Sequence, residues 1–213
     1  MANNKNKVSE TVIRRLPKYH RYLSELHDKG EDRISSQELS DLTGFTASQI
    51  RQDLNNFGGF GQQGYGYKVA VLKAELENIL GISTIYKTII IGSGRLGSVV
   101  SNYKGFRDSG FEVVAMFDRD EHVIGTSVGK HVVKSVDELE DFLKEHDEVS
   151  VAILTVPKEG AQSIAERLAE CGIRGIWNFA PEDLEELDHV IVENIRLTDS
   201  LLTLSYYLTE EDR

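Results

Sequence analysis

Cysteine is nearly absent from this chain, since Cys171 is the only one among 213 residues. A single cysteine excludes an intrachain disulfide. The sequence also lacks an apolar run of about 18 to 20 residues, the length that a membrane-spanning helix needs. Its polar start, MANNKNK, lacks the apolar stretch of a secretory signal. We therefore expect a cytoplasmic protein without a membrane partner, and the apolar content of 40% is sufficient for a sizeable core.

Catalytic and metal-binding motifs are missing as well. The sequence contains no HExxH, no GxSxG and no Cys/His spacing suited to a metal ion. None of the six histidines stands in a pattern that would hold a proton donor beside a partner. Cys171, which precedes Gly172, is typical of a small residue at a helix end rather than of a nucleophile. We expect neither a catalytic site nor a metal site.

Positive charge is scarce overall, and the formal net charge is −11. Because a polyanion such as DNA needs a basic surface, this average argues against nucleic acid. The charge is unevenly distributed, however. Residues 1–22 carry six Lys or Arg side chains, among them Arg14 and Arg15, against the single carboxylate of Glu10. A basic start on an acidic chain indicates two parts with different partners, although a solvated basic tail would have the same composition.

Two helix starts follow each other early in the chain. Ser35 and Glu38 have the spacing of a capping box, and Thr46 and Gln49 repeat it, with Gly44 between them to allow a sharp turn. This pattern predicts a helix-turn-helix. The polar face of the second helix presents Ser48, Gln49, Arg51, Gln52, Asn55 and Asn56. Arginine and amide side chains suit the edges of guanine and adenine, so we expect this face to read bases, the alternative being a solvated surface.

Glycines and aromatic residues alternate directly after this motif, in FGGFGQQGYGY at residues 57–67. After a recognition-type helix this stretch predicts a hairpin wing, anchored by Phe60, Tyr65 and Tyr67, whose glycines approach the DNA backbone closely. Upstream, apolar residues recur with helical period, and Pro17 either begins that first helix or kinks it. Residues 1–84 are thus expected to form a winged-helix DNA-binding domain.

The rest of the chain alternates between strand-like and helical patterns. Strands are predicted at residues 88–92, 111–117, 149–156, 173–177 and 189–192, and helices near residues 95–107, 135–146 and 158–171. Such alternation predicts an α/β fold, in which a mostly parallel, doubly wound sheet carries helices on its faces. We assign it to residues 85–195.

A dinucleotide-binding turn opens this second domain. Gly92, Gly94 and Gly97 follow the strand TIII and begin a helix, which is the context that a G-x-G-x-x-G motif requires. The first glycine allows a tight turn, the second allows the backbone to touch a pyrophosphate, and the third allows helix and strand to pack closely. Asp118 ends the next strand, roughly 20 residues further on, where a carboxylate accepts hydrogen bonds from the adenosine ribose. The cofactor expected is NAD(H) rather than NADP(H), although Arg119 would suit a 2′-phosphate.

These features together resemble the Rex family of bacterial redox-sensing transcriptional repressors, over essentially the whole chain. The segments that carry the resemblance are RRLPKYHRYL, SSQELSDLTG, QIRQDL, FGGFGQQGYGY, LGSVVSNYKGF, FDRD, TVP, AQSIAERLAECGI, WNFAP and LSYYL. The resemblance implies a homodimer whose winged helices bind double-stranded DNA at an inverted-repeat operator. It also implies that the protein senses the NADH/NAD⁺ ratio and is released from the operator by NADH.

Carried over by position, the resemblance assigns residues to three sites. The cofactor-binding set is Gly92, Ser93, Gly94, Arg95, Leu96, Gly97, Tyr103, Asp118, Arg119, Thr155, Val156 and Pro157. The DNA-binding set is Ser48, Gln49, Arg51, Gln52 and the wing residues Gln62 and Gln63, to which we add the basic residues Arg14 and Arg15. Coupling between the sites involves Arg21 and Tyr103. Arg196 stands where relatives commonly carry an aspartate of this network, and Asp199 lies about one helical turn further on.

The end of the chain carries an apolar stripe. Leu197, Leu201, Leu204 and Leu208 repeat at helical spacing, and such a stripe must be covered. The resemblance implies that residues 196–213 form a domain-swapped helix between two subunits, whereas a self-packed terminal helix is the alternative. Three other functions share the dinucleotide motif: an NAD(H)-dependent oxidoreductase with a helical appendage, a nucleotide- or CoA-binding interaction module, and a repressor with a weakened redox response. We expect a repressor and not an enzyme.

Overall fold

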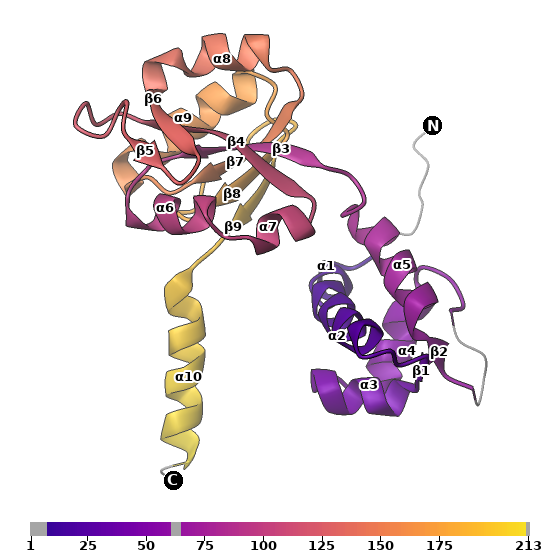
Figure 1. Ribbon diagram of the computed structural model, residues 1–213. Coiled ribbons are helices and arrows are strands. Elements are labelled where there is room, and N and C mark those ends of the chain that lie inside the picture. Colours follow the sequence, from indigo (N-terminus) through magenta and orange to yellow (C-terminus); the bar gives the residue numbers. More distant parts are fainter. Residues whose placement is uncertain (1–7, 61–64, 212–213) are drawn as a thin grey trace, which may run out of the picture. The chain divides into compact units, whose positions relative to one another are not determined.

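The computed structural model describes residues 8–60 and 65–211. The chain divides into two compact units, Met1–Thr84 and Ile85–Arg213 (Figure 1). Within the described part of the chain, no helix combines the length and the apolar character needed to cross a membrane.

The first unit is mainly helical. Its helices are α1 (Glu10–Ile13), α2 (Leu16–Asp28), α3 (Ser36–Thr43), α4 (Ala47–Asn55) and α5 (Val69–Leu80), and its strands are β1 (Arg33–Ile34) and β2 (Tyr67–Lys68). Pro17 lies in the first turn of α2, so it begins a new helix after a turn at Arg14 and Arg15. The core of this unit includes Tyr19, Leu23, Leu39, Ile50 and Leu72, which are all fully buried or nearly so.

Both predicted capping boxes are present. At the start of α3, Ser35 Oγ accepts from the N–H of Glu38 at 3.1 Å, and the N–H of Ser35 donates to Glu38 Oε2 at 2.7 Å. At the start of α4, Thr46 Oγ1 accepts from the N–H of Gln49 at 3.2 Å, and the N–H of Thr46 donates to Gln49 Oε1 at 3.0 Å. Gly44, with a φ of 74°, ends α3 in the left-handed conformation. The predicted helix-turn-helix is therefore confirmed.

The small sheet beside this motif differs from the predicted hairpin. β2 pairs antiparallel with β1, which lies before α3, and residues 57–60 form no strand. Gly66 allows this close approach, because its φ is +68° and a Cβ there would lie 2.6 Å from the Ile34 oxygen. Phe60 and Tyr67 pack on the core, but Tyr65 is 70% exposed and is not part of this core. The pairing partner, Arg33–Ile34, is too short to give a strand pattern. Gln62 and Gln63 lie outside the described residues.

The second unit is an α/β domain. Its strands are β3 (Tyr86–Ile91), β4 (Phe111–Asp118), β5 (Ser127–Val128), β6 (His131–Ser135), β7 (Val149–Leu154), β8 (Gly175–Asn178) and β9 (Ile191–Asn194). Its helices are α6 (Arg95–Ser101), α7 (Gly105–Asp108), the 3₁₀ helix Val136–Glu138, α8 (Leu139–Glu145), α9 (Lys158–Glu170) and α10 (Leu197–Glu211). All five predicted strands are present within a few residues of their expected limits. The helix predicted near residues 95–107 is interrupted and forms α6 and α7.

The strands form one seven-stranded sheet with the order β5-β6-β4-β3-β7-β8-β9. All neighbours are parallel except β5 and β6. Without β5, this is the strand order of a Rossmann fold, so the predicted doubly wound sheet is confirmed. Sequence periodicity did not reveal β5 and β6, which are short and partly polar at the edge of the sheet.

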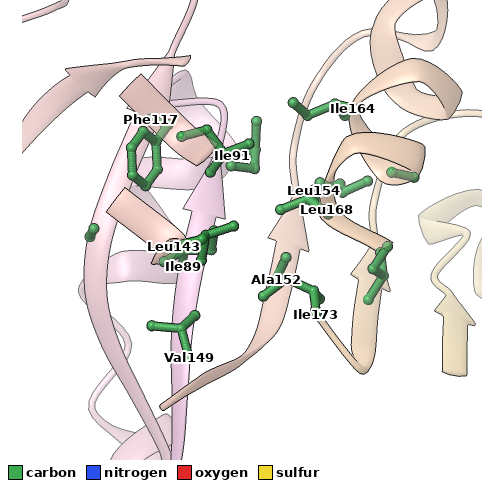
Figure 2. Packing of buried hydrophobic residues seen from close by; sticks show 14 residues of the cluster. Ile89, Ile91, Phe117, Leu143, Val149, Ala152, Leu154, Ile164, Leu168 and Ile173 are labelled. Atoms are coloured by element: carbon green, nitrogen blue, oxygen red, sulfur yellow. The ribbon is translucent and has the colours of Figure 1, made fainter. Parts of the chain in front are cut away.

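Both faces of the sheet are covered, as Figure 1 shows, with α8 and α9 on one face and α6 and α7 on the other. Alternation along β3 divides its isoleucines between the two cores. Ile89 and Ile91 lie on the face that α8 and α9 cover, in one cluster with Leu154 of β7 and Leu168 of α9 (Figure 2). Ile90 belongs to the opposite cluster with residues of α6. Burial on both faces explains why the strand reads as a continuous apolar run.

Helix α10 forms at the predicted position, and its side chains are exposed in this single chain. Seven large apolar side chains on it are between 53% and 67% exposed: Leu197, Leu201, Leu202, Leu204, Tyr206, Tyr207 and Leu208. So extensive an apolar surface is unusual for a helix that stays in water. Within its own unit, α10 is therefore not packed on the sheet or on the helices that cover it.

Candidate functional site

A cavity of about 460 Å³ lies at the carboxyl ends of β3 and β7. The two neighbours of β3 are β4 and β7, so the chain leaves this central strand toward opposite edges of the sheet. Ligands of doubly wound sheets bind in the crevice at such a switch point. The fold thus places a ligand-sized cavity directly beside the glycine-rich turn.

The protein's own packing requires two of the three motif glycines. Gly92 has a φ of +100°, and a Cβ there would lie 2.8 Å from the backbone oxygen of Thr155. A Cβ on Gly97 would lie 2.0 Å from the Gly92 oxygen, so helix α6 approaches the turn only because this residue has no side chain. Thr155 stabilises the same turn, because its Oγ1 donates to the Gly92 oxygen at 2.8 Å.

Gly94 differs from the other two. A Cβ on this residue would meet no atom within 4 Å, although Gly94 lines the cavity. Packing within the protein therefore gives no reason for a glycine here. Close approach of a ligand gives one, since a methyl group would occupy the space that a phosphate bound to the turn needs. The residues present thus fit a dinucleotide at this turn.

Asp118 lies at the end of β4 and lines the same cavity. Its Oδ2 accepts from both the N–H and the hydroxyl of Ser93, each at 2.6 Å. Its Oδ1 accepts from the N–H groups of Arg119 at 2.7 Å and Asp120 at 3.0 Å. Partial burial by itself raises the pKa of this carboxyl, but the hydrogen bonds from Ser93, Asp120 and Arg119 together lower it below the ordinary value. Asp118 is therefore a carboxylate at neutral pH.

The structure brings most of the predicted cofactor residues to the cavity wall. The residues of the predicted set that line it are Gly92, Gly94, Asp118, Arg119, Thr155, Val156 and Pro157. Ser93, which lies within the turn, is buried, and its hydroxyl donates to Asp118. Of the described residues, Arg95, Leu96, Gly97 and Tyr103 are not part of this wall.

The sequence did not point to several residues of the wall. They are Ile91, Val136, Glu159, Gly160, Ser163, Ile164 and Arg167. Most lie on α9, whose first turns follow β7 at the switch point, so the topology would have located them. Arg167 is held by a bidentate pair with Glu140 at 2.6 and 2.9 Å, and it also donates to the oxygen of Val136. The guanidinium that lines the cavity is thus held in place by a paired carboxylate.

A second candidate surface is the exposed face of α4. The side chains that extend from it are Ser48, Gln49, Arg51, Gln52, Asn55 and Asn56, as the sequence predicted. Arg51 donates to Ser36 Oγ of α3 at 2.8 Å, which orients its guanidinium at the surface. Gln49 Oε1 is engaged in the cap of its own helix. Chemically, this face offers donors and acceptors suited to base edges.

On the buried side of α4, the sequence did not point to Asp53. Asp53 accepts from Arg15 Nε and Nη2, each at 2.7 Å, and from the Tyr19 hydroxyl at 2.7 Å. The side chain of Asp53 is only 3% exposed and that of Arg15 17%. Two of the guanidinium nitrogens of Arg15 are thus bound within the domain. Arg14 forms an exposed pair with Glu10 at 2.8 Å.

The predicted coupling residues lie in both units. In the first unit, the guanidinium of Arg21 lies over the ring of Tyr22, 5.1 Å from its centroid. In the second unit, the exposed Tyr103 packs edge-on against Phe106. Arg196 donates to the oxygen of Ala180 at 2.5 Å and pairs with Asp183. The charge of Arg196 is thus bound within its own unit.

Asp199 is exposed in the first turn of α10, and its N–H donates to the oxygen of Arg196 at 3.2 Å.

Two protein families match separate parts of the chain. Residues 7–55 match the family described as "Putative DNA-binding protein N-terminus", and residues 83–182 match the family described as "CoA binding domain". The chain is 55% identical over 210 residues to the redox-sensing transcriptional repressor Rex of Clostridioides difficile (strain 630), covering 99% of each protein. It is 50% identical over 212 residues to the protein of the same name from Clostridium beijerinckii, covering 100% of each.

Two solved structures also match this chain over nearly its whole length. The crystal structure of RSP in complex with beta-NAD⁺ and operator DNA matches with a TM-score of 0.89 and 52% identity, covering 96% of this chain and 94% of that chain. RSP in complex with beta-NADH matches with a TM-score of 0.89 and 49% identity, covering 97% of each chain. The similarity thus extends over both units.

Proposed function

This chain belongs to the Rex family of redox-sensing transcriptional repressors, and we propose that it represses transcription from an inverted-repeat operator and releases that DNA when NADH binds. The observation that carries this proposal is the combination of two surfaces in one chain. One is the polar face of a capped recognition-type helix, and the other is a cavity beside a glycine-rich turn at the switch point of a Rossmann sheet.

For the DNA half, we assign the base-reading role to α4. Arg51 is the leading candidate because it is exposed and oriented by Ser36, and its planar fork matches the O6 and N7 atoms of guanine. Ser48, Gln49 and Gln52 flank it, and Gln62 and Gln63, which follow α4 in the sequence, are assigned to the minor groove. Arg14 is assigned to a phosphate. Besides the predicted DNA contact, we assign Arg15 the role of holding α4, because its pair with Asp53 ties that helix to the turn before α2.

For the dinucleotide half, the turn from Gly92 to Gly97 would hold the pyrophosphate, and Asp118 would accept from the adenosine ribose. Thr155, Val156 and Pro157 complete the wall on the β7 side. Arg167 and Arg119 are cationic groups near the cavity, but the ionised Asp118 opposes a 2′-phosphate, which favours NAD(H) over NADP(H). The ligand supplies the signal through the charge of its nicotinamide ring, which is positive only when oxidised.

The quaternary structure proposed is a homodimer in which α10 is exchanged between subunits. Its apolar residues lack cover within the described single chain, and a second copy would bury them. Two recognition helices related by a two-fold axis would then reach successive major grooves about one helical turn apart. Because α10 follows the Rossmann domain directly, it is the element through which a change in the cavity would reach the DNA-binding heads.

The relatives are named as transcriptional repressors, and we propose that this chain is likewise not an enzyme and acts in the cytoplasm with the DNA. The alternative that a specific observation favours is a repressor with a weakened redox response. That observation is Arg196, which pairs with Asp183 and supplies no carboxylate to the coupling network. Asp199 is the candidate replacement.

The test is fluorescence anisotropy of a labelled AT-rich inverted-repeat duplex with the full-length protein, titrated with NADH and separately with NAD⁺. Release by NADH but not by NAD⁺ is expected. By linkage, the operator must weaken NADH binding by the same factor by which NADH weakens operator binding. The coupling free energy between two such sites is typically about 1–3 kcal/mol. Specific DNA binding that ignores both nucleotides would favour the weakened repressor, and Arg196→Asp would then be expected to restore the response.

Two variants separate the sites. Arg51→Ala should abolish operator selection while NADH affinity stays unchanged, and Asp118→Ala should weaken NADH binding while operator binding stays intact. Turnover of a substrate with consumption of NADH would instead support the oxidoreductase. Ligand binding without any operator recognition would support an interaction module.

A further inference from the structure

The carboxylate of Asp118 is already saturated with hydrogen-bond donors from the protein. A carboxylate offers about four lone-pair positions, two on each oxygen. Oδ1 accepts from two backbone N–H groups, those of Arg119 and Asp120, and Oδ2 accepts from the N–H and the hydroxyl of Ser93. The contact distances lie between 2.6 and 3.0 Å, so all four positions are filled by well-formed bonds.

These four donors are not equally free to move. Three are backbone N–H groups whose positions are set by the glycine-rich turn and by the end of β4. The fourth is the Ser93 hydroxyl, which can leave by rotation about a single side-chain bond. It is therefore the one donor of the four that an incoming hydroxyl group could displace without a change in the backbone.

From this arrangement we propose that Ser93 is an internal competitor for the adenosine ribose and thereby sets the dinucleotide affinity. The inference rests on the proposed function, because it requires a ribose hydroxyl to bind Asp118. When the dinucleotide binds, a ribose hydroxyl takes the lone pair on Oδ2 and the Ser93 hydroxyl turns away. Part of the binding energy is spent on breaking the internal bond, so the affinity is lower than the same cavity would otherwise give.

Ser93 acts through Asp118 and is thus an affinity-setting residue rather than a direct ligand contact. The residue is buried, with an exposed fraction of 8%, and its backbone carbonyl oxygen accepts a hydrogen bond from Ser98 Oγ at 3.1 Å. The position is therefore well defined. Replacing Ser93 by alanine removes the competing hydroxyl and keeps the backbone donor.

The experiment measures NADH affinity by calorimetry on the full-length protein. Ser93→Ala should tighten binding by about three- to tenfold, the range set by the net worth of one hydrogen bond. Ser101→Ala is the matched control, because it removes a hydroxyl that bonds only within the α6 region and should leave affinity unchanged. Combined with Asp118→Ala, the Ser93 substitution should lose its effect, since the group competed for is gone.

An unchanged or weaker affinity in Ser93→Ala would overturn the proposal, as would an equal gain in the Asp118→Ala background. A weaker affinity would mean that the hydroxyl contacts the ligand directly. Failure of the proposed function gives a different result, because the unmodified protein would then not bind NADH at all. The proposed competition would then be refuted as well.

Discussion

Asp53→Ala tests whether the buried pair with Arg15 holds the recognition helix. The substitution removes the acceptor of three hydrogen bonds, two from Arg15 and one from Tyr19. Tyr19 is fully buried, and burial together with the Asp53 hydrogen bond raises the pKa of its hydroxyl well above the ordinary value. That hydroxyl would lose its acceptor in the core.

The expected loss of stability follows from the burial of each group. Leaving a buried hydroxyl without a partner costs about 1–3 kcal/mol. Breaking a fully buried ion pair costs about 3–5 kcal/mol, but the side chain of Arg15 is 17% exposed and regains some hydration, so its share is smaller. We expect the free energy of unfolding to fall by about 3 kcal/mol in total.

The assay is urea denaturation of the full-length protein, followed by circular dichroism, with operator and NADH affinities measured on the same samples. Operator affinity should fall because α4 is no longer held against α2, while NADH affinity should not change. Arg15→Ala should behave like Asp53→Ala, and the double variant should cost less than the sum of the two. A stability loss below about 1 kcal/mol in Asp53→Ala would refute the reasoning. So would an Arg15→Ala protein of normal stability whose operator binding shows a smaller salt dependence, since that is the behaviour of a phosphate contact.

Three further predictions address the cavity, a buried histidine and the terminal helix. The Gly94→Ala protein should fold normally but bind NADH at least about tenfold more weakly, as measured by calorimetry. The Gly97→Ala protein should lose at least about 1–3 kcal/mol of folding stability, because the added Cβ meets the backbone oxygen of Gly92. Equal behaviour of the two variants would contradict the assigned roles. Burial, and to a lesser extent the charge of Lys130, lower the pKa of the His131 imidazole below its ordinary value of 6.5. As the pH falls, the unfolded chain therefore takes up this proton before the folded protein does. The free energy of unfolding should then decrease as the pH drops below about 6.5. Denaturation across pH should show this decline flattened in His131→Gln. Leu204→Asp on α10 should convert the dimer to monomers in sedimentation experiments, and a stable dimer would exclude α10 from the interface.

Local sequence signals determined much of this structure. The two capping boxes, Gly44 and the position of Pro17 each act within a few residues, so their effect on the backbone could be read directly from the chain. The same holds for the G-x-G-x-x-G turn and for Asp118, because the spacing of strand, turn and helix is itself the signal. Helix periodicity likewise located α10.

Contacts between distant parts of the chain required the tertiary structure. The pairing of β1 with β2 joins Ile34 to Tyr67 across two helices, and the bond from Arg15 to Asp53 joins the turn before α2 to α4. Neither leaves a periodic trace in the sequence. The part of the cavity wall that α9 contributes, and the hydrogen bonds from Ser93 to Asp118, likewise depend on how the sheet is wound. Periodicity determines which face of an element is buried, but only the fold decides which side chains meet, because the partner of a buried polar group is set by three-dimensional proximity and not by spacing along the chain.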